Sequence, residues 1–255
     1  MLQNKVKQLL SDGQAAWGAG LVDDSDLVAK FTVDTGIDFL WIDLEHRPYD
    51  FNEVKWIPII CRMKGCDAIV RVAHNDPALI KKSLDIGATG VMIPQVNNVD
   101  EARQAVAYCK YPPQGSRGVS PLWNFYLDVG YEEYLPVAND ETCVIVEIET
   151  AEGIENLEAI CAVEGIDVIF AGPTDIAAAL GYIEQLDHPE VKRFLQDFAA
   201  RVTACGKQAG ITKRGIEAAQ MAYDQGYRFI VIGNLAYQGG IALKANLHSA
   251  RQHER

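Results

Sequence analysis

The sequence of 255 residues lacks four features, and each absence excludes a class of protein. It has no CxxC pair, no block of Lys or Arg, no apolar run long enough to span a bilayer, and no internal repeat. The formal net charge is −12, and such an acidic surface repels nucleic-acid phosphates and anionic lipid headgroups. We therefore expect neither a nucleic acid nor a membrane as a partner.

The cysteines do not form a disulfide or zinc-binding pattern by their spacing. Several stand in apolar runs, such as Cys143-Val-Ile-Val. We expect free, buried thiols of a reducing compartment. The first residues also contain no apolar signal core. Together these features predict a cytoplasmic protein.

Short apolar runs recur along the chain with helix-like segments between them, which is typical of parallel strands buried on both faces. Eight such runs are present, at Ala15 to Leu21, Ile37 to Asp43, Asp67 to Val72, Gly90 to Pro94, Cys143 to Glu149, Asp167 to Phe170, Gln208 to Ile211 and Phe229 to Gly233. A chain of this length fits the roughly 250 residues of one (β/α)8 barrel. We predict a single α/β domain of this kind over residues 1–255.

Helix-start signals open the segments between the runs, as in Asn75-Asp-Pro and His188-Pro-Glu. One connection, Lys110 to Asp140, is much longer than the others and contains several prolines and glycines. Long connections in compact domains are usually functional. We expect this one to form a lid or side wall at the active-site face, with a short helix near Tyr131 to Leu135.

Polar residues end four of the apolar runs. In a (β/α)8 barrel, reactive groups project from the carboxyl ends of the strands, so these residues are catalytic candidates. They are Asp43, Glu45 and His46 after the second run, Arg71 in the third, Glu147 and Glu149 in the fifth, and Asp175 just after the sixth.

Glu149 and Asp175 follow neighbouring strands, where two carboxylates could share one divalent cation. Oxygen ligands of this kind favour Mg²⁺ or Mn²⁺, with Co²⁺ as a further candidate. The alternative is that each carboxylate only caps the helix that follows it.

Arg71 and His46 each have two interpretations. The Arg71 guanidinium could hold a substrate carboxylate or an enolate oxygen, or it could form a structural ion pair inside the barrel. His46 follows two acidic residues, which would raise its basicity and fix its tautomer as a general base requires, although a single histidine on a loop is often inert. Gly172, Pro173 and Thr174 precede Asp175 at an expected helix start, where backbone N–H groups can bind an anion. The alternative is an ordinary joint between a loop and a helix.

Taken together, these segments resemble the HpcH/HpaI family of class II aldolases over nearly the whole chain. The resemblance lies in Gly36-Ile-Asp-Phe-Leu-Trp-Ile-Asp43-Leu-Glu45-His46, Val70-Arg71-Val, Asn75-Asp-Pro, Asp85-Ile-Gly-Ala, Ile93-Pro-Gln-Val-Asn, Tyr111-Pro-Pro-Gln-Gly-Ser-Arg117-Gly-Val, Glu147-Ile-Glu149-Thr, Phe170-Ala-Gly-Pro-Thr-Asp175-Ile and His188-Pro-Glu-Val.

The resemblance implies a barrel of the phosphoenolpyruvate/pyruvate-binding type whose last helix packs against a partner subunit, in a hexamer built as a trimer of dimers. It further implies that Glu149 and Asp175 ligate the metal, that Arg71 stabilises an enolate, and that His46 is the base. Asp43, and Asp85 from a neighbouring subunit, would orient His46. Backbone N–H groups around Gly172 would receive the pyruvate carboxylate.

The sequence departs from the family's pattern where the aldehyde is expected to bind. Glu147 stands where relatives commonly carry Gln, Thr212-Lys213 replaces a more usual apolar pair, and Asn234 stands where Asp is frequent. The long connection carries Trp123 among several aromatics. We expect Glu147 and Trp123 to contact the substrate. Because of these departures, the sequence does not determine which aldehyde binds.

The predicted function is a metal-dependent aldolase that reversibly cleaves a 4-hydroxy-2-oxo acid into pyruvate and an aldehyde. Two alternatives use the same site, a Claisen-type condensing enzyme and an oxaloacetate decarboxylase. A Schiff-base aldolase is disfavoured because only Lys213 stands near a strand end. The alternative from another functional class is a barrel that binds an oxo acid without catalysing a reaction. This alternative stays open because one fold can have many functions.

Overall fold

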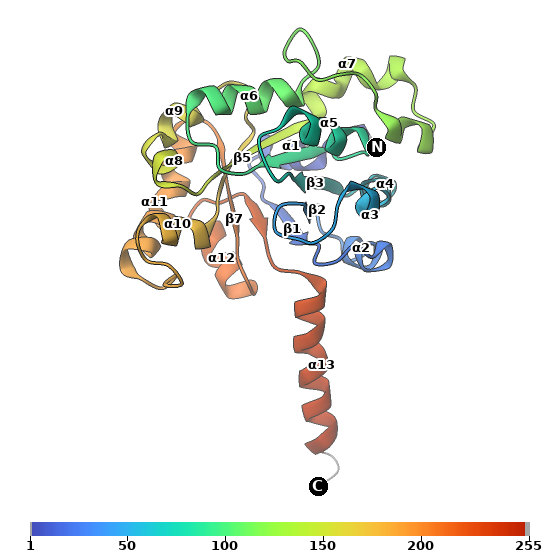
Figure 1. Cartoon of the computed structure of the whole chain (residues 1–255). Helices are drawn as coiled ribbons and strands as arrows, with labels where there is room; N and C mark the ends of the chain where they lie inside the picture. Colours follow the sequence, from blue (N-terminus) through green and yellow to red (C-terminus); the bar gives the residue numbers. More distant parts are fainter. Residues whose placement is uncertain (1, 253–255) are drawn as a thin grey trace.

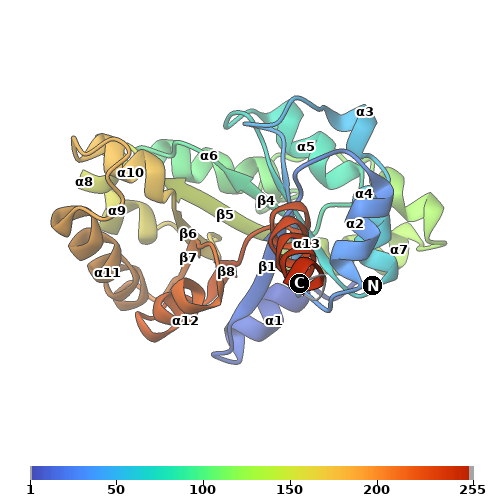
Figure 2. The same ribbon diagram turned by 90° about the horizontal axis from the view of Figure 1, so that it is seen from below.

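The computed structural model describes residues 2–252, and eight parallel strands form a closed barrel in the order β1 to β8 (Figures 1 and 2). All eight predicted strands are present. Their bounds are β1 Ala16–Gly20, β2 Phe39–Asp43, β3 Asp67–Arg71, β4 Gly90–Ile93, β5 Cys143–Ile148, β6 Val168–Ala171, β7 Gln208–Thr212 and β8 Phe229–Val231. The predicted (β/α)8 fold is confirmed.

Helices surround the strands (Figure 2). They are α1 Lys5–Ser11, α2 Asp26–Val33, α3 Phe51–Val54, α4 Ile57–Met63, α5 Pro77–Asp85, α6 Val99–Cys109, the 3-10 helix η1 Leu122–Tyr126, α7 Tyr131–Glu141, α8 Ala151–Glu155, α9 Leu157–Cys161, α10 Pro173–Ala179, α11 Pro189–Ala204, α12 Ile216–Asp224 and α13 Leu235–Gln252. The sequence signals act as expected, since Asp76 and His188 cap α5 and α11 and a proline follows each cap.

The barrel interior is filled by large side chains, including Phe39, Ile69, Phe170 and Phe229. Space inside the barrel is tight: a Cβ on Gly18 would lie 2.2 Å from the Phe39 ring, so this position accepts only glycine. Val6 and Leu10 of α1 belong to the same cluster. Helix α1 therefore closes the barrel at the end where the strands begin.

The register of the strands brings the polar strand-end residues to the opposite end of the barrel. In the strand register, Asp43 of β2 lies opposite Arg71 of β3, and Glu147 of β5 lies opposite Phe170 of β6. Parallel strands place their carboxyl ends at one face, so these side chains meet there.

The segment from Lys110 to Asp140 does not lie at that face, which corrects the expectation of a lid or side wall. It follows α6, which returns the chain to the amino ends of the strands, and the Lys110 ammonium donates to the Thr142 carbonyl just before β5 (2.9 Å). Helix α7 is longer than the short helix expected there. The segment packs beside α4 and α5 instead.

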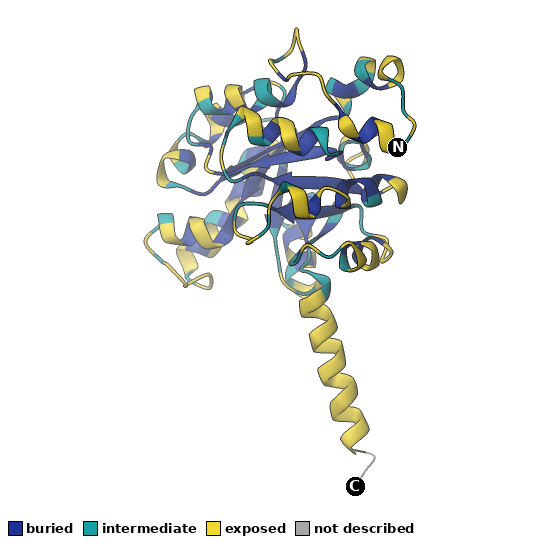
Figure 3. Ribbon diagram, turned by 45° about the vertical axis from the view of Figure 1, so that its right-hand side comes forward, coloured by how far each residue is buried: buried dark blue, intermediate teal, exposed yellow. Residues whose placement is uncertain are grey.

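Helix α13 extends away from the barrel, and none of its described residues is buried (Figures 1 and 3). Large apolar side chains on it are exposed, among them Ile241, Leu243 and Leu247. That this helix packs against a partner subunit stays a prediction. Within residues 2–252, no helix has both the length and the apolar character needed to cross a membrane.

Candidate active site

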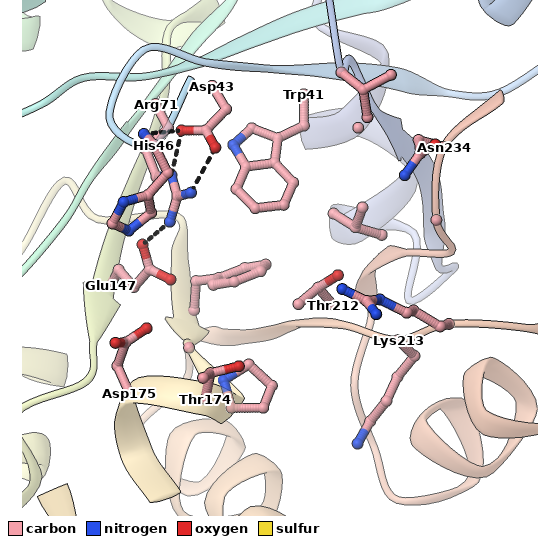
Figure 4. Close-up of a pocket in the computed structure, with 18 of the residues that line it drawn as sticks. Trp41, Asp43, His46, Arg71, Glu147, Thr174, Asp175, Thr212, Lys213 and Asn234 are labelled. Atoms are coloured by element: carbon pink, nitrogen blue, oxygen red, sulfur yellow. Dashed lines mark hydrogen bonds and ion pairs between the residues drawn. The ribbon is translucent and has the colours of Figure 1, made fainter. Parts of the chain in front are cut away.

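A cavity of about 760 Å³ opens at the carboxyl ends of the strands (Figure 4). Its walls come from seven of the eight strands, either from the strands themselves or from the loops that follow them. The lining residues that bear on the chemistry are Trp41, Asp43, His46, Arg71, Glu147, Gly172, Pro173, Thr174, Asp175, Thr212, Lys213, Arg214 and Asn234. The strand-end argument from the sequence thus locates the cavity correctly.

Arg71 is buried at the wall of this cavity and is surrounded by carboxylates. Its Nε and Nη2 donate to the two carboxylate oxygens of Asp43 at 3.0 and 2.8 Å. Its Nη1 lies 3.1 Å from Glu45 Oε2 and 3.3 Å from Glu147 Oε2. The guanidinium also lies over the Trp41 ring, 4.6 Å from its centroid. Asp43 therefore fixes the plane of Arg71, while Nη1 remains directed toward the more weakly held carboxylates.

The electrostatics of these carboxylates differ. Burial would raise the pKa of Asp43, but hydrogen bonds from Arg71 outweigh it and hold the pKa below its ordinary value. For Glu147, burial and the nearby Glu149 carboxylate raise the pKa well above the usual range, although Arg71 opposes the rise. Burial also raises the pKa of Glu45. Asp43 is thus the permanent counter-ion of Arg71, and Glu147 can carry a proton.

Glu149 lies next to Glu147 and Asp175. Burial raises the pKa of its carboxyl to about 7, and repulsion from Glu45 and Asp175 adds to the rise. The Gln95 backbone N–H donates to Glu149 Oε1 (3.1 Å). Glu149 itself does not line the cavity, whereas the exposed Asp175 does.

Gly172 forms a cradle for these carboxylates. A Cβ at this position would lie 2.8 Å from Glu149 Oε2 and 2.9 Å from Glu147 Oε1, so a larger residue would displace them. Hard oxygen donors held together against their own repulsion fit a divalent cation. Among residues 2–252, no three His, Cys, Asp or Glu side chains form a complete metal-binding set. Two protein carboxylates would leave the other coordination positions to substrate and water.

His46 stands at the cavity's edge, with its side chain largely exposed and its Nε2 3.6 Å from Glu45 Oε2. Its backbone N–H donates to Asp43 Oδ1 (3.3 Å). Figure 4 shows the ring beside Arg71 and Glu147. Asp43 thus positions the loop that carries His46, and it contacts the backbone rather than the imidazole.

Two predicted site residues lie elsewhere. Trp123 is fully buried between Tyr111, Tyr134 and Ile59, with the Arg62 guanidinium 3.8 Å from its ring centroid. The prediction that it contacts substrate is wrong for this chain's own cavity, because the segment that carries it lies at the amino end of the barrel.

Asp85 ends α5 at the amino end of the barrel and pairs with Arg117 (3.0 Å). It does not line the cavity of its own chain. A role for Asp85 beside His46 of a neighbouring subunit stays a prediction.

Sequence reasoning did not assign Trp41 to the site. It named Glu45 as a candidate and as an acidic neighbour of His46, but it did not predict the ion pair of Glu45 with Arg71. Trp41, Asp43 and Glu45 alternate along β2 and its extension, and residues two apart on a strand share one face. That spacing was the available signal, since Phe39 and Trp41 both pack with the interior cluster.

Comparison with known proteins agrees with this geometry. The family model described as HpcH/HpaI aldolase/citrate lyase matches residues 22–248. This chain belongs to that family. A relative from Pseudomonas putida, named 2-dehydro-3,6-dideoxy-6-sulfogluconate aldolase, is 36% identical over 226 residues, which cover 89% of each chain. The hydroxypyruvate/pyruvate aldolase of Roseobacter denitrificans is 34% identical over 90% of each chain. The relatives of this HpcH/HpaI protein are thus named aldolases, which are lyases.

Solved structures are similar over almost the full chain. The HpcH/HpaI aldolase/citrate lyase family protein from Burkholderia cenocepacia J2315 superposes with a TM-score of 0.87 at 31% identity, covering 99% of this chain and 100% of that one. The citrate synthase SbnG gives a TM-score of 0.85 at 27% identity, covering 99% of both chains. Proteins similar to this chain are therefore named both as aldolases and as a citrate synthase.

Proposed function

We propose that this chain is a divalent-cation-dependent aldolase that reversibly cleaves a 4-hydroxy-2-oxo acid into pyruvate and an aldehyde. The observation that carries the proposal is the buried Arg71 at the cavity wall, next to the carboxylates of Glu149 and Asp175 on neighbouring strand ends. An arginine and a cation site together suit a substrate whose reacting end bears a carboxylate and a carbonyl oxygen.

Glu149 and Asp175 would hold the cation, Mg²⁺ or Mn²⁺ by their oxygen ligands and Co²⁺ as a further candidate. When bound, this ion would act as a Lewis acid on the 2-oxo acid and lower the energy of its enolate. The cradle at Gly172 supports the assignment of Glu149, because a side chain at position 172 would displace the Glu149 carboxylate.

Arg71 would stabilise the negative charge that develops on the C2 oxygen. Asp43 already accepts from Nε and from one hydrogen of Nη2. Nη1 would therefore donate to the substrate oxygen, which would compete for it with Glu45 and Glu147. A donor fixed before the substrate arrives needs no reorganisation during the reaction.

His46 would accept the proton of the C4 hydroxyl in the cleavage direction, directly or through one water. The Glu45 carboxylate 3.6 Å away would stabilise the imidazolium that results. Gly172, Pro173 and Thr174 line the cavity beside Asp175 at the start of α10. Backbone N–H groups there would receive the pyruvate carboxylate, although Pro173 itself has none to give.

A condensing enzyme that uses oxaloacetate is the second candidate. The likeness to the citrate synthase SbnG favours it, and so does the additional carboxylate of Glu147 beside the enolate position. Both reactions pass through the same enolate and differ in the electrophile that it attacks.

The test is metal-dependent release of pyruvate from a panel of 4-hydroxy-2-oxo acids, with and without chelator. We expect release that the chelator abolishes and that His46→Ala and Asp175→Ala both lack. Consumption of oxaloacetate with no pyruvate release from any panel member would favour the condensing enzyme or a decarboxylase. Pyruvate binding without any turnover would favour a non-catalytic barrel.

A further inference from the structure

We propose that the wall of the cavity opposite Arg71 binds an anionic group at the far end of the aldehyde, with Lys213 as the counter-charge. This inference rests on the proposed function and narrows its substrate class. The preferred aldehyde would carry a terminal carboxylate, sulfonate or phosphate.

The charges that line the cavity are divided between its two sides. Asp43, Glu147 and Asp175 lie on the side of Arg71, and Lys213 and Arg214 follow β7 on the other side. Figure 4 shows Lys213 well separated from His46, Arg71 and Glu147. A second anionic group on the substrate would be repelled by the carboxylates and attracted to the β7 side.

Lys213 has no counter-ion within the part of the chain that the structure describes. Among residues 2–252, no carboxylate pairs with its ammonium, and burial alone lowers its pKa. Other partly buried lysines are paired: Lys7 lies 2.9 Å from Asp167, and Lys207 donates to the Ile166 carbonyl at 2.9 Å. A half-buried charge without a partner is costly. A ligand anion would supply the partner that the described residues do not.

The surroundings of Lys213 make it suitable for recognition. Its backbone N–H donates to the Val231 carbonyl (2.8 Å), which fixes the end of β7. Leu186 and Leu195 also line the cavity and would accommodate an alkyl stem. The cation and the apolar wall together match an aldehyde with a short chain and an anionic end.

The anionic group takes no part in bond making. In cleavage, the C4 hydroxyl proton goes to the base, the C3–C4 bond breaks with its electron pair on C3 of the pyruvate enolate, and C4 becomes the aldehyde carbon. C3 then takes a proton to give pyruvate. Lys213 would therefore act on the binding and placement of the aldehyde, and its effect belongs in the KM for that substrate.

The experiment compares two acceptors in the condensation with pyruvate, butanal and 4-oxobutanoate, which share a four-carbon chain and differ in terminal charge. For the unmodified enzyme, kcat/KM should be at least about tenfold higher with 4-oxobutanoate, the advantage of one charge-assisted contact. Lys213→Met should remove that preference, chiefly through KM, and Lys213→Arg should restore most of it. Lys30→Met is the matched control, because it removes the same charge from exposed α2 outside the cavity.

Three results would overturn the inference. If Lys213→Met leaves the ratio of kcat/KM between the two acceptors unchanged, Lys213 does not recognise the charge of the acceptor. An equal loss with both acceptors would indicate a structural role. A covalent adduct at Lys213 after borohydride treatment with pyruvate would show a nucleophilic lysine instead. If the unmodified enzyme forms no condensation product from pyruvate and either aldehyde, the proposed function itself is overturned, and this inference with it.

Discussion

Two ends of the same barrel each bury an arginine, and they use it differently. At the carboxyl end, Arg71 lies among Asp43, Glu45 and Glu147 at the wall of an open cavity. At the amino end, Arg62 donates to the carbonyls of Gly87 and Ala88 (2.7 and 3.3 Å) and stacks on Trp123. Both residues are arginines, so their surroundings determine which of them can contact a substrate and which has a structural role.

The amino end is packed and closed. Helix α1 fills the mouth of the barrel, and the Val6 N–H donates to Asp67 Oδ2 (2.7 Å) at the start of β3. The aromatic cluster around Trp123 packs against Ile59 of α4. The carboxyl end instead gathers carboxylates whose pKa values are raised by burial and by one another. Stability is thus concentrated at one end and reactivity at the other, as in other barrels of this type.

The largest effect is expected at the cation site. Asp175→Asn should reduce turnover by roughly 10³-fold, since a bound cation contributes several kcal/mol to the stability of the transition state. The midpoint of thermal unfolding should change little, because Asp175 is exposed. Steady-state kinetics and calorimetry measure the two quantities. Asp100→Asn on exposed α6 is the control, and a loss of turnover equal to that of the control would contradict the assignment.

Trp123→Ala tests the closed end. It should lower the free energy of unfolding by about 3–5 kcal/mol, the usual cost of truncating a buried aromatic, and leave KM for the oxo acid unchanged. Denaturant unfolding and initial rates measure these effects. If the variant unfolds at the same denaturant concentration as the unmodified enzyme but has a raised KM, Trp123 contributes to the active site after all.

A pair of arginine variants sharpens the comparison directly. Arg71→Lys keeps the charge but loses the fork that Asp43 holds, and kcat should fall by roughly 10²–10³-fold, as for the loss of one oxyanion donor. Arg62→Lys should reduce the free energy of unfolding with kcat retained. Equal changes in kcat and in the free energy of unfolding for the two variants would contradict the account.

The smallest of these effects is expected from Gly172→Ala. The new Cβ would press on Glu149 Oε2 and Glu147 Oε1, so the affinity for Mn²⁺ should fall by about tenfold, an energy of about 1.4 kcal/mol. Titration of the free enzyme with Mn²⁺, followed by electron paramagnetic resonance, measures this without turnover. Gly239→Ala is the control, because open space surrounds that position on α13. Unchanged Mn²⁺ affinity would show that the cradle does not position the ligands.

The sequence predicted the strands and the polar residues at their carboxyl ends because both follow from local pattern. Buried parallel strands appear as short apolar runs, and Asp43, Arg71 and Glu147 interrupt those runs where a charge is expensive. The prediction of eight strands and one barrel needed no information on distant contacts.

The long connection was placed at the wrong end for a physical reason. Its length and prolines suggested function, but the end on which it lies depends on chain direction. Helix α6 brings the chain back to the amino ends, so Lys110 and the residues after it start from there. Lys213 was recognised only as a lysine near a strand end, because its lack of a counter-ion depends on residues far away in the sequence.

The measurement that tests the account most directly is exchange of the pyruvate methyl protons with D₂O, followed by proton NMR with no aldehyde present. Enolate formation alone produces this exchange. We expect exchange that requires Mg²⁺ or Mn²⁺ and that Arg71→Lys and Asp175→Asn both lose, while Arg62→Lys retains it. Exchange that is insensitive to chelator, or that survives in Asp175→Asn, would contradict the assignment of the carboxyl end as a cation-assisted enolate site.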